Sequence, residues 1–445
     1  MAGRRTPTTR ETVTTRNEPA RATASGARVL PLHGQAQSYA WGSPTAIPNL
    51  LGAAATGEPV AELWLGTHPV ATALAEDDGI RRPATDLVGQ LPFLLKVLAA
   101  EKALSLQVHP DLAQARAGFD ADDAAGLGLG DPRRRYRDRN HKPELIVALS
   151  PFRALAGMRD PGRTLAIVAR LGSPALTAAF RPLADDPSGG AAQVLRSLLT
   201  MPREPARDLV RGLVATARRL AAGPYGAAAP TAPGPPSAET DDTATDGAAV
   251  DGAEADDVAR AADLIGLLAA AHPGDVGIAA ALLLNDVTLR PGEGLFQPAR
   301  LLHAYVSGLG IEIMAASDNV LRGGLTPKHI DVDELLRILD PTPSAAPILM
   351  PRTLAVSSGG LLRGWDVPVG DFALTEAICT GGALDVGRPM LLLAIEGAVR
   401  VTGTADDGTT VAPVELRGGR SALLAGSAAL TLTGTGRVFL AASGR

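Results

Sequence analysis

The pattern of apolar and polar residues divides the chain into stretches of different character. From about residue 29 to 153, brief apolar runs such as PVAELWLGTHP are broken by Gly and Pro, as in short strands joined by turns. From about 160 to 285, apolar residues recur at three- and four-residue spacing, which is typical of amphipathic helices. Strand character then returns, and from about residue 366 short apolar runs alternate with Gly turns, as in a sandwich or barrel. The sequence therefore predicts a mainly β protein with a helical insertion.

The predicted helices carry start and stop signals. The segment REPARDLVRGLVATARRLAAG has Pro205 where a first helical turn tolerates it, and Gly223 at a position that closes a helix. The segment DDVARAADLIGLLAAAHPGD begins with acidic residues, which favour the helix dipole. Residues 223–257 are rich in Pro, Gly, Ala and Asp, with one aromatic residue and one Val. Such a composition buries too little surface to fold, so we expect a disordered acidic loop there.

The first 27 residues differ from the rest of the chain. Residues 1–27 are rich in Thr and Arg and nearly free of large aliphatic side chains, which predicts a disordered tail. Glu11 and Glu18 argue against a transit peptide, and no apolar core of a secretory signal is present. No run of about 18 apolar residues predicts a membrane span. We therefore expect a cytoplasmic protein with no membrane partner.

Composition and charge narrow the function classes. The chain has 445 residues, enough for two or three domains. Its net charge of −5 argues against a nucleic-acid partner, whereas an anionic small substrate needs only a few local cations. Cys379 is the single cysteine, which excludes an intrachain disulfide and a thiolate zinc cluster.

The stretch SLQVHPD, residues 105–111, alternates polar and apolar side chains. In a strand, Ser105, Gln107 and His109 would share one face. One interpretation is a half-buried strand whose polar face meets water. The other is that Gln107 and His109 are paired metal ligands, since residues two apart on a strand can reach one ion.

Two further residues have suitable chemistry for such a site. Pro143 forces the residues before it to be extended, and Glu144 then opens a strongly apolar strand, where an unpaired carboxylate would be costly to bury. His303 enters another apolar segment, LLHAYV. A solvent-exposed strand start and a hydrogen-bonded core histidine are the alternatives for these two residues. One Gln, one Glu and two His suit a borderline divalent metal such as zinc.

Five blocks of the sequence carry a family resemblance. YAWGS, PFLLKVLAAEKALSLQVHPD, NHKPEL, LHAYVSG and GIEIMAASDNVLRGGLTPKHIDV follow one another between about Tyr39 and Asp333. In this order they resemble the type I phosphomannose isomerases, zinc enzymes of the cupin superfamily. The resemblance implies cupin-type jelly-roll barrels, one catalytic and one C-terminal, plus an α-helical domain. The expected units are a tail (1–27), a catalytic cupin domain in two parts (28–155 and 285–330), a helical insertion (156–284) and a C-terminal jelly roll (331–445).

The resemblance also implies an activity and a cofactor. The expected reaction is the interconversion of D-mannose 6-phosphate and D-fructose 6-phosphate by proton transfer between C1 and C2, through a cis-enediol. The expected partner is a sugar phosphate, the expected cofactor is one Zn²⁺ per subunit, and the chain is expected to be a monomer. The zinc ligands implied by the resemblance are Gln107, His109, Glu144 and His303.

Glu312 and Arg322 are the candidate catalytic residues. Glu312 lies between two isoleucines, where burial would raise its pKa toward the working range of a proton carrier. A paired core charge is the structural alternative, and Lys142 or a zinc-bound water could carry the proton instead. Arg322 matches the arginine that the family places in the active site, and a guanidinium can hold a phosphate through two hydrogen bonds. Further candidates for contacting the sugar phosphate are Lys96, Ser105, Lys142, Lys328 and Asp318, the last by ordering the Arg322 loop.

Two other functions were weighed against the isomerase. A cupin metal oxygenase usually binds iron through two or three histidines, and Gln107 fits that site less well. A non-catalytic sugar-binding cupin would be expected to have lost a ligand or Arg322. The chain keeps all of these residues, which favours the isomerase.

Overall fold

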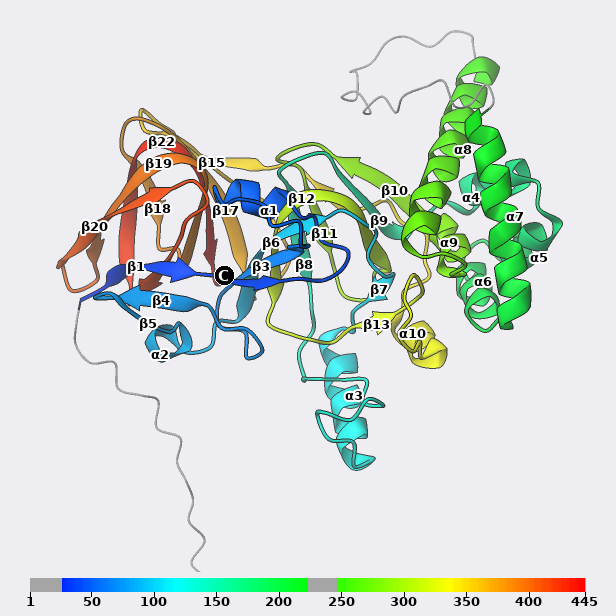
Figure 1. Ribbon diagram of the computed structural model, residues 1–445, viewed down its shortest axis with the longest axis horizontal. Coiled ribbons are helices and arrows are strands. Elements are labelled where there is room, and N and C mark those ends of the chain that lie inside the picture. Colours follow the sequence, from blue (N-terminus) through cyan, green and yellow to red (C-terminus); the bar gives the residue numbers. More distant parts are fainter. Residues whose placement is uncertain (1–25, 223–245, 445) are drawn as a thin grey trace, which may run out of the picture.

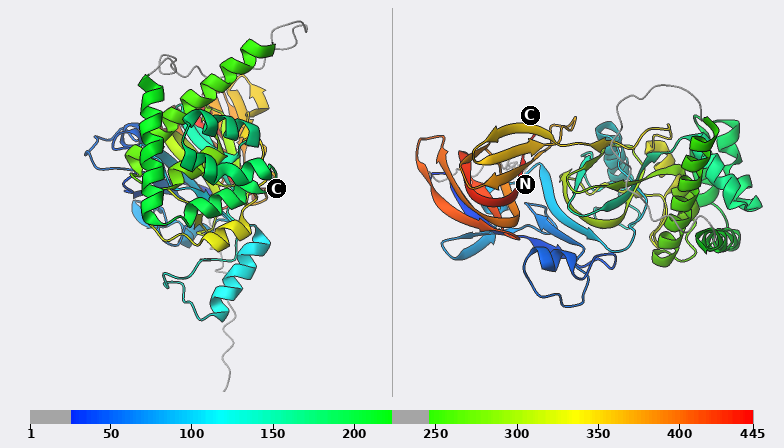
Figure 2. Two further views of the ribbon diagram at one scale, coloured as in Figure 1. Left: turned by 90° about the vertical axis from the view of Figure 1, so that its right-hand side faces the viewer. Right: turned by 90° about the horizontal axis from the view of Figure 1, so that it is seen from above.

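The computed structural model describes residues 26–222 and 246–444, which form three parts in a row (Figure 1). Two β units lie side by side, and a bundle of helices covers the far end of one of them (Figure 2). The predictions for residues 1–25 and 223–245 lie outside the described residues. The mainly β fold class with a helical region is confirmed; the jelly-roll assignment of each β unit stays a prediction.

The first β unit is an 11-stranded antiparallel sheet, called here the site sheet. Its central order is β14-β11-β8-β12-β6-β3-β2, with β7, β9, β10 and β13 attached beside it. The long strand β12 runs through the middle and pairs with β6, β7, β8 and β9. Its strands are β2 (Gln35–Gln37), β3 (Glu62–Leu65), β6 (Phe93–Ala100), β7 (Gln107–Val108), β8 (Glu144–Ala148), β9 (Phe152–Met158), β10 (Leu284–Leu289), β11 (Gly294–Gln297), β12 (His303–Ala315), β13 (Leu321–Arg322) and β14 (Ile348–Leu349).

The second β unit is another 11-stranded sheet, called here the C-terminal sheet, in the order β15-β16-β17-β22-β19-β21-β1-β4-β5 with β18 and β20 at its sides. Its strands are β1 (Arg28–His33), β4 (Leu74–Asp77), β5 (Ile80–Pro83), β15 (Arg352–Ser357), β16 (Gly360–Gly364), β17 (Ala373–Thr380), β18 (Leu384–Gly387), β19 (Leu391–Ala405), β20 (Thr410–Arg417), β21 (Ser421–Ala425) and β22 (Ala428–Ala442).

The N-terminal strand belongs to the C-terminal sheet, which corrects one predicted boundary. Residues 28–33 were expected in the catalytic domain, but β1 pairs with β21, with Leu30 opposite Leu423. This pairing joins segments almost 400 residues apart, so no local pattern could show it. The apolar residues of β1 are buried there, and Leu30 lies in a core that both sheets share.

The helical prediction for residues 160–285 is confirmed for the described residues, up to the start of β10 at Leu284. Two of the helices have side-chain caps that were not predicted: the Asp160 side chain accepts from the Arg163 N–H, and Ser173 accepts from the Leu176 N–H. The apolar faces of the bundle form one core with β7, β9, β12 and β13 of the site sheet. The helices are α4 (Pro161–Leu171), α5 (Pro174–Asp185), α6 (Gly190–Leu199), α7 (Arg203–Ala222), α8 (Asp246–Ala271) and α9 (Gly277–Ala280), followed by a 3₁₀ turn (Ala281–Leu283).

Part of the predicted acidic loop is helical instead. Helix α8 begins at Asp246, so residues 246–257 were wrongly assigned to disorder. This segment is rich in Ala, the strongest helix former, and it continues directly into the apolar face that packs in the bundle. The low hydrophobicity of this segment was therefore a poor guide to disorder, because the segment continues a helix whose C-terminal part is packed in the bundle.

A helix absent from the predictions follows the SLQVHPD stretch. Helix α3 (Leu112–Ala124) starts with a capping box in which the Asp111 side chain accepts from the Gln114 N–H and the Gln114 side chain accepts from the Asp111 N–H. The D-x-x-Q spacing was the signal for it. The remaining helices are α1 (Ala46–Leu50), α2 (Thr85–Val88) and α10 (Val332–Ile338). No helix in the described ranges has both the length and the hydropathy to cross a membrane.

Candidate metal and substrate site

Three buried side chains meet inside the site sheet. The candidate ligand atoms of His109, Glu144 and His303 all lie within 4.8 Å of one another. His109 Nε2 is 3.4 Å from one oxygen of Glu144, and His303 Nε2 is 3.4 Å from the other. The three residues come from the end of β7 and the first positions of β8 and β12, so the strand register brings together residues distant in the sequence.

Both imidazole rings are oriented with Nε2 toward the centre of this cluster. His109 Nδ1 lies 2.7 Å from the Asn319 carbonyl oxygen, and His303 Nδ1 lies 2.9 Å from the Leu301 carbonyl oxygen. A carbonyl can only accept, so each Nδ1 carries the proton and each Nε2 has a free lone pair. His109 Nε2 is buried and has no hydrogen-bond partner within the described part of the chain. An orphaned nitrogen lone pair beside a carboxylate and a second imidazole fits a divalent metal.

Gln107 lies next to this cluster through its strand register. On β7, Gln107 is directly opposite His303 of β12 and Arg322 of β13. Residues directly opposite in an antiparallel pair place their side chains on the same face. The half-buried Gln107 therefore shares a face with His303 and Arg322, where its amide oxygen can add a fourth ligand.

The electrostatics favour a charged Glu144 and a neutral His109. Burial by itself would raise the pKa of Glu144, but Lys142 and the two histidines hold it well below its usual value. Lys142 Nζ lies 3.0 Å from the Glu144 carboxylate. Burial lowers the pKa of His109 to about 4, so the imidazole is neutral near pH 7. A carboxylate and neutral imidazoles are the protonation states in which these side chains bind metals.

A second buried network centres on Glu312. Lys96 Nζ donates to one Glu312 oxygen at 2.9 Å, and the Tyr305 hydroxyl donates to the other at 2.7 Å. Gln297 Nε2 donates to the Tyr305 hydroxyl at 2.7 Å, while Gln297 Oε1 is buried without a partner among the described residues. Lys96 is also 3.5 Å from Glu62. Glu312 is thus paired in the core, which was the alternative to a catalytic role in the sequence analysis. It nevertheless lies in the same buried interior as the histidine cluster.

The pKa of Glu312 is raised from its usual value, as its position between two isoleucines predicted. Burial is the main cause, and repulsion from Glu144 and Glu62 adds to it, whereas Lys96 opposes it. Burial would lower the pKa of Lys96, but the surrounding carboxylates Glu312, Glu62 and Glu144 hold it above its usual value. Burial also raises the pKa of Tyr305 well above its usual value. A cationic Lys96 and a neutral Tyr305 therefore flank the Glu312 carboxyl group, whose affinity for a proton is increased.

The remaining predicted residues differ in exposure. Arg322 is half-buried, and Lys328 is exposed. Repulsion from Arg322 is the main cause that lowers the pKa of Lys328. Ser105 is half-buried two residues before Gln107.

Asp318 does not have the contacts that were predicted for it. It was expected to order the Arg322 loop, but one of its carboxylate oxygens lies 3.3 Å from His68 Nε2, and its N–H donates to Asp138 at 2.8 Å. His68 is buried against the Trp64 ring, so it draws the Asp318 carboxylate toward β3 instead. Asp318 remains on the rim of the site as a candidate for contacting a sugar hydroxyl.

Sequence reasoning missed several polar residues of this interior. Tyr305 is two residues after His303, and the alternation applied to Ser105, Gln107 and His109 would have placed it on the same face. Gln297 is directly opposite Glu144 in the register of β11 and β8, which only the fold reveals. Glu62 also belongs to the network through Lys96, whereas His68 pairs with Asp318. The THP sequence around His68 gave no signal for this contact.

Comparison with known proteins identifies relatives. Residues 29–161 match the family model for the catalytic domain of type I phosphomannose isomerase. Mannose-6-phosphate isomerase of Salmonella typhimurium is 34% identical over 76% of this chain and 81% of its own length. The Escherichia coli enzyme is 30% identical over 90% of this chain and 96% of its own, and the human enzyme is 30% identical over 88% and 92%.

Solved structures agree with the sequence comparison. A zinc-bound mannose 6-phosphate isomerase superposes with a TM-score of 0.75 at 29% identity, covering 94% of this chain and 100% of that one. The Salmonella typhimurium enzyme solved with substrate (f6p) and zinc gives a TM-score of 0.74 at 29% identity and the same coverage. With such identity over most of both lengths, and with one fold, the chain belongs to the family of type I mannose-6-phosphate isomerases.

Proposed function

We propose that this protein interconverts D-mannose 6-phosphate and D-fructose 6-phosphate with one bound zinc ion. The observation that carries the proposal is the buried cluster of His109, Glu144 and His303, with its unpartnered Nε2, in the same interior as Glu312. Family membership supports the substrate class, since the solved relatives include one with zinc and substrate (f6p) together.

Gln107, His109, Glu144 and His303 would hold the zinc ion. Bound there, zinc supplies Lewis-acid polarisation of a sugar carbonyl or hydroxyl oxygen. The carbonyl oxygens behind His109 and His303 fix the direction of the two rings. Lys142 stabilises the charged form of Glu144 through its contact at 3.0 Å.

Glu312 would move the proton between C1 and C2 through a cis-enediol. A base near neutral pH must both accept and return a proton, and the raised pKa of Glu312 brings it toward that range. Lys96 and Tyr305 grip both of its oxygens, which fixes the carboxyl group while its proton affinity stays increased. Lys142 is the less favourable candidate because Glu144 already engages it.

Arg322 and Lys328 would hold the anionic end of the substrate. Arg322 is opposite Gln107 in the register of the β7–β13 pair, on the face of the proposed metal ligands. The charge of Arg322 lowers the pKa of Lys328, as expected of two cations that repel each other. A phosphate or developing oxyanion between them would relieve the repulsion. Ser105 and Asp318 would contact sugar hydroxyls.

The test is turnover of mannose 6-phosphate to fructose 6-phosphate by the purified protein as isolated, after chelation and after zinc is added back. Activity should fall on chelation and return with zinc. Gln107→Ala and His303→Ala should lose both zinc and activity, Arg322→Ala should lose activity but keep zinc, and His33→Ala, a histidine on β1, should behave as wild type. A folded, zinc-loaded protein without turnover would instead favour a non-catalytic sugar-binding cupin or a cupin metalloenzyme of other specificity.

A further inference from the structure

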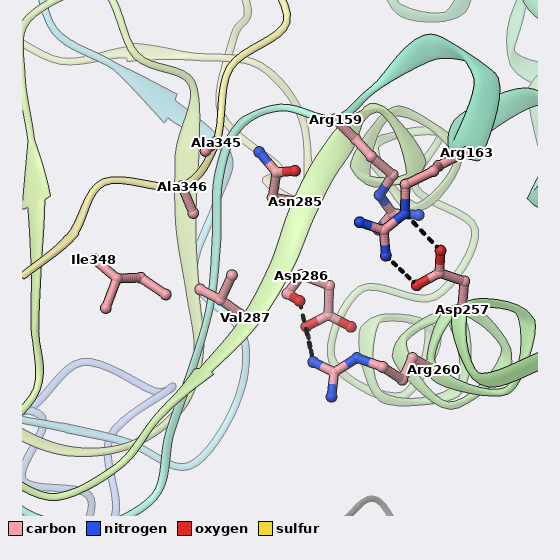
Figure 3. A pocket seen from close by; sticks show the side chains of 10 residues that line it. All are labelled: Arg159, Arg163, Asp257, Arg260, Asn285, Asp286, Val287, Ala345, Ala346 and Ile348. Carbon is pink, nitrogen blue, oxygen red and sulfur yellow. Dashed lines mark hydrogen bonds and ion pairs between the residues drawn. The ribbon is translucent and has the colours of Figure 1, made fainter. Parts of the chain in front are cut away.

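An arginine-lined cavity lies where the helical bundle meets β10 (Figure 3). Its volume is about 350 Å³, within the range of small-molecule sites. Its walls come from the loop after β9, from α4 and α8, from β10 and from the segment that leads into β14. One end is charged, with Arg159, Arg163 and Arg260, and the other is apolar, with Val287 and Ile348 (Figure 3). None of the metal-centre residues lines it.

Arg159 is a buried cation without a counter-charge of its own. Only 8% of the residue is exposed. Its backbone N–H donates to the Leu283 carbonyl, but its guanidinium makes no hydrogen bond or ion pair with any residue in the described ranges. Burial lowers the pKa of Arg159 from its usual value; the nearby carboxylates Asp286 and Asp257 oppose this shift, and the charges of Arg163 and Arg260 add to it. An arginine cannot shed its proton in a protein, so a guanidinium with so little exposure to solvent is stabilised when an anion meets it in the cavity.

The two carboxylates of the cavity are already engaged by other arginines. Asp257 accepts from Arg163 Nε at 2.8 Å and Nη2 at 2.7 Å (Figure 3). Asp286 accepts from Arg153 Nε at 2.9 Å and Nη2 at 2.7 Å. The lining therefore has one more guanidinium than carboxylate, and the surplus charge is that of Arg159.

The cavity wall is held in place without any ligand. Asn285 Nδ2 donates to the Ala156 carbonyl at 3.0 Å and to the Ser344 carbonyl at 2.8 Å, which ties β10 to β9 and to the segment before β14. Arg260 donates to the Asp286 carbonyl at 3.1 Å and fixes α8 against β10. A preformed wall with one unsatisfied cation needs little reorganisation to accept an anion.

We propose that this cavity binds a small organic oxyanion, a carboxylate or a phosphate monoester, whose charged group pairs with Arg159 and whose apolar part lies against Val287 and Ile348. The planar guanidinium can donate two parallel hydrogen bonds to either group. The apolar end distinguishes such a ligand from a bare inorganic ion. The site is separate from the proposed isomerase chemistry and stands whether or not that chemistry is correct.

The experiment is thermal unfolding of the full chain at constant ionic strength in sodium chloride, titrated with four sodium salts. Acetate is compared with isovalerate, and inorganic phosphate with butyl phosphate, so that head group and apolar part are varied separately. The Arg322→Ala variant serves as the background, because a phosphate could also bind at the proposed active site. We expect a saturable rise in Tm, with binding tighter by about fourfold for each methylene buried. The head group that gives the larger rise identifies the ligand class.

The matched variants are Arg159→Met and, as a control, Arg181→Met on the exposed surface of α5. Arg159→Met keeps the aliphatic stem and removes the unpaired charge, so without oxyanion its Tm should equal or exceed the background value. It should abolish the response to oxyanions, Arg159→Lys should weaken it, and Arg181→Met should leave it unchanged. If Arg159→Met is less stable or unfolded in chloride, Arg159 is structural and the proposal is wrong. An unchanged oxyanion response in Arg159→Met, or none in the background, would equally overturn it.

Discussion

At the scale of single residues, the site consists of buried charges that compensate one another. Glu144 is held charged by Lys142 and by two imidazoles, while Glu312 is gripped by Lys96 and Tyr305. Removing one member of such a network leaves its partner unpaired in a low-dielectric interior, which is more costly than the pair itself is stabilising. Function is therefore tested best by substitutions that keep the size of the side chain and remove only its charge or its hydroxyl group.

Glu312→Gln should leave zinc content near wild type, lower Tm because buried Lys96 loses its closest carboxylate, and lower kcat by about 10²–10⁴-fold, the contribution of a positioned proton carrier. The amide keeps the shape and the acceptor for Tyr305 but cannot take up the proton. Zinc analysis, thermal unfolding and steady-state kinetics on one preparation are the measurements. Near-normal turnover would exclude Glu312 as the proton carrier.

Tyr305→Phe should shift the acidic limb of the pH profile of kcat/KM to higher pH. The Tyr305 hydroxyl donates to Glu312 and so lowers the pKa of Glu312; without it that pKa rises further. A base is active only when deprotonated, so a higher pKa moves the loss of activity on acidification to higher pH. If the acidic limb of the pH profile stays in place or moves to lower pH, Glu312 is not the group whose ionisation sets this limb.

The metal-free protein should lose stability as the pH falls from about 6.5 to about 4. The pKa of His109 is lowered to about 4 in the folded state, so between these values the unfolded chain binds more protons than the folded one. Urea unfolding of chelated protein across this range measures the slope. His109→Gln, which has no titrating ring, should show a shallower slope; an equal slope would assign the effect to other groups.

At the scale of elements, helix α3 illustrates how local signals and packing combine. Its capping box sets the start, and its middle passes so close to a buried aromatic ring that only Gly fits. A Cβ on Gly118 would lie 2.2 Å from the Tyr136 ring. Tyr136 is buried and its hydroxyl donates to Glu334 of α10, so the ring cannot move away cheaply.

Gly118→Ala should therefore destabilise the protein by about 1–3 kcal/mol, the usual cost of overpacking. Gly212→Ala on α7 is the matched control, because a Cβ there meets nothing within 4 Å. It should stabilise by about 0.5–1 kcal/mol through helix propensity alone. Denaturant unfolding of both variants checks the opposite signs, and a stabilising Gly118→Ala would contradict the close packing of α3 on Tyr136.

At the scale of the whole molecule, the two β units are joined by a common core. Phe93 and Ile313 of the site sheet and Trp365 and Phe439 of the C-terminal unit belong to one buried cluster, and the last two rings stack with centroids 6.1 Å apart. The N-terminal strand β1 lies between β21 and β4 in the C-terminal sheet, so this sheet needs both ends of the chain. The monomeric state stays a prediction.

Phe439→Ala should thus lower the midpoint of thermal inactivation, although residue 439 belongs to the other sheet. Losing a fully buried ring costs about 3–5 kcal/mol, and a shared core passes that loss to the site sheet. KM measured well below the midpoint should stay unchanged. If the midpoint of inactivation does not move while the C-terminal unit melts earlier, the two β units unfold independently.

By itself the sequence determined the fold class, the helical insertion and the main chemical groups. Helical periodicity at 160–285 and polar–apolar alternation at Ser105, Gln107 and His109 are local, and backbone geometry translates them directly into elements and faces. The position of Glu312 between two isoleucines likewise predicted the direction of its pKa shift, because burial follows from near neighbours.

Only the tertiary structure decided which residues meet. Gln297 faces Glu144, Asp318 pairs with His68, β1 joins β21, and the Arg159 guanidinium has no ion-pair partner among the described residues. Each of these depends on strand register or packing between segments distant in the chain. Local propensity carries no information on such contacts, since many arrangements of the same elements satisfy it equally. They are selected by the free energy of the packed whole, in which most buried charges find a partner across the fold.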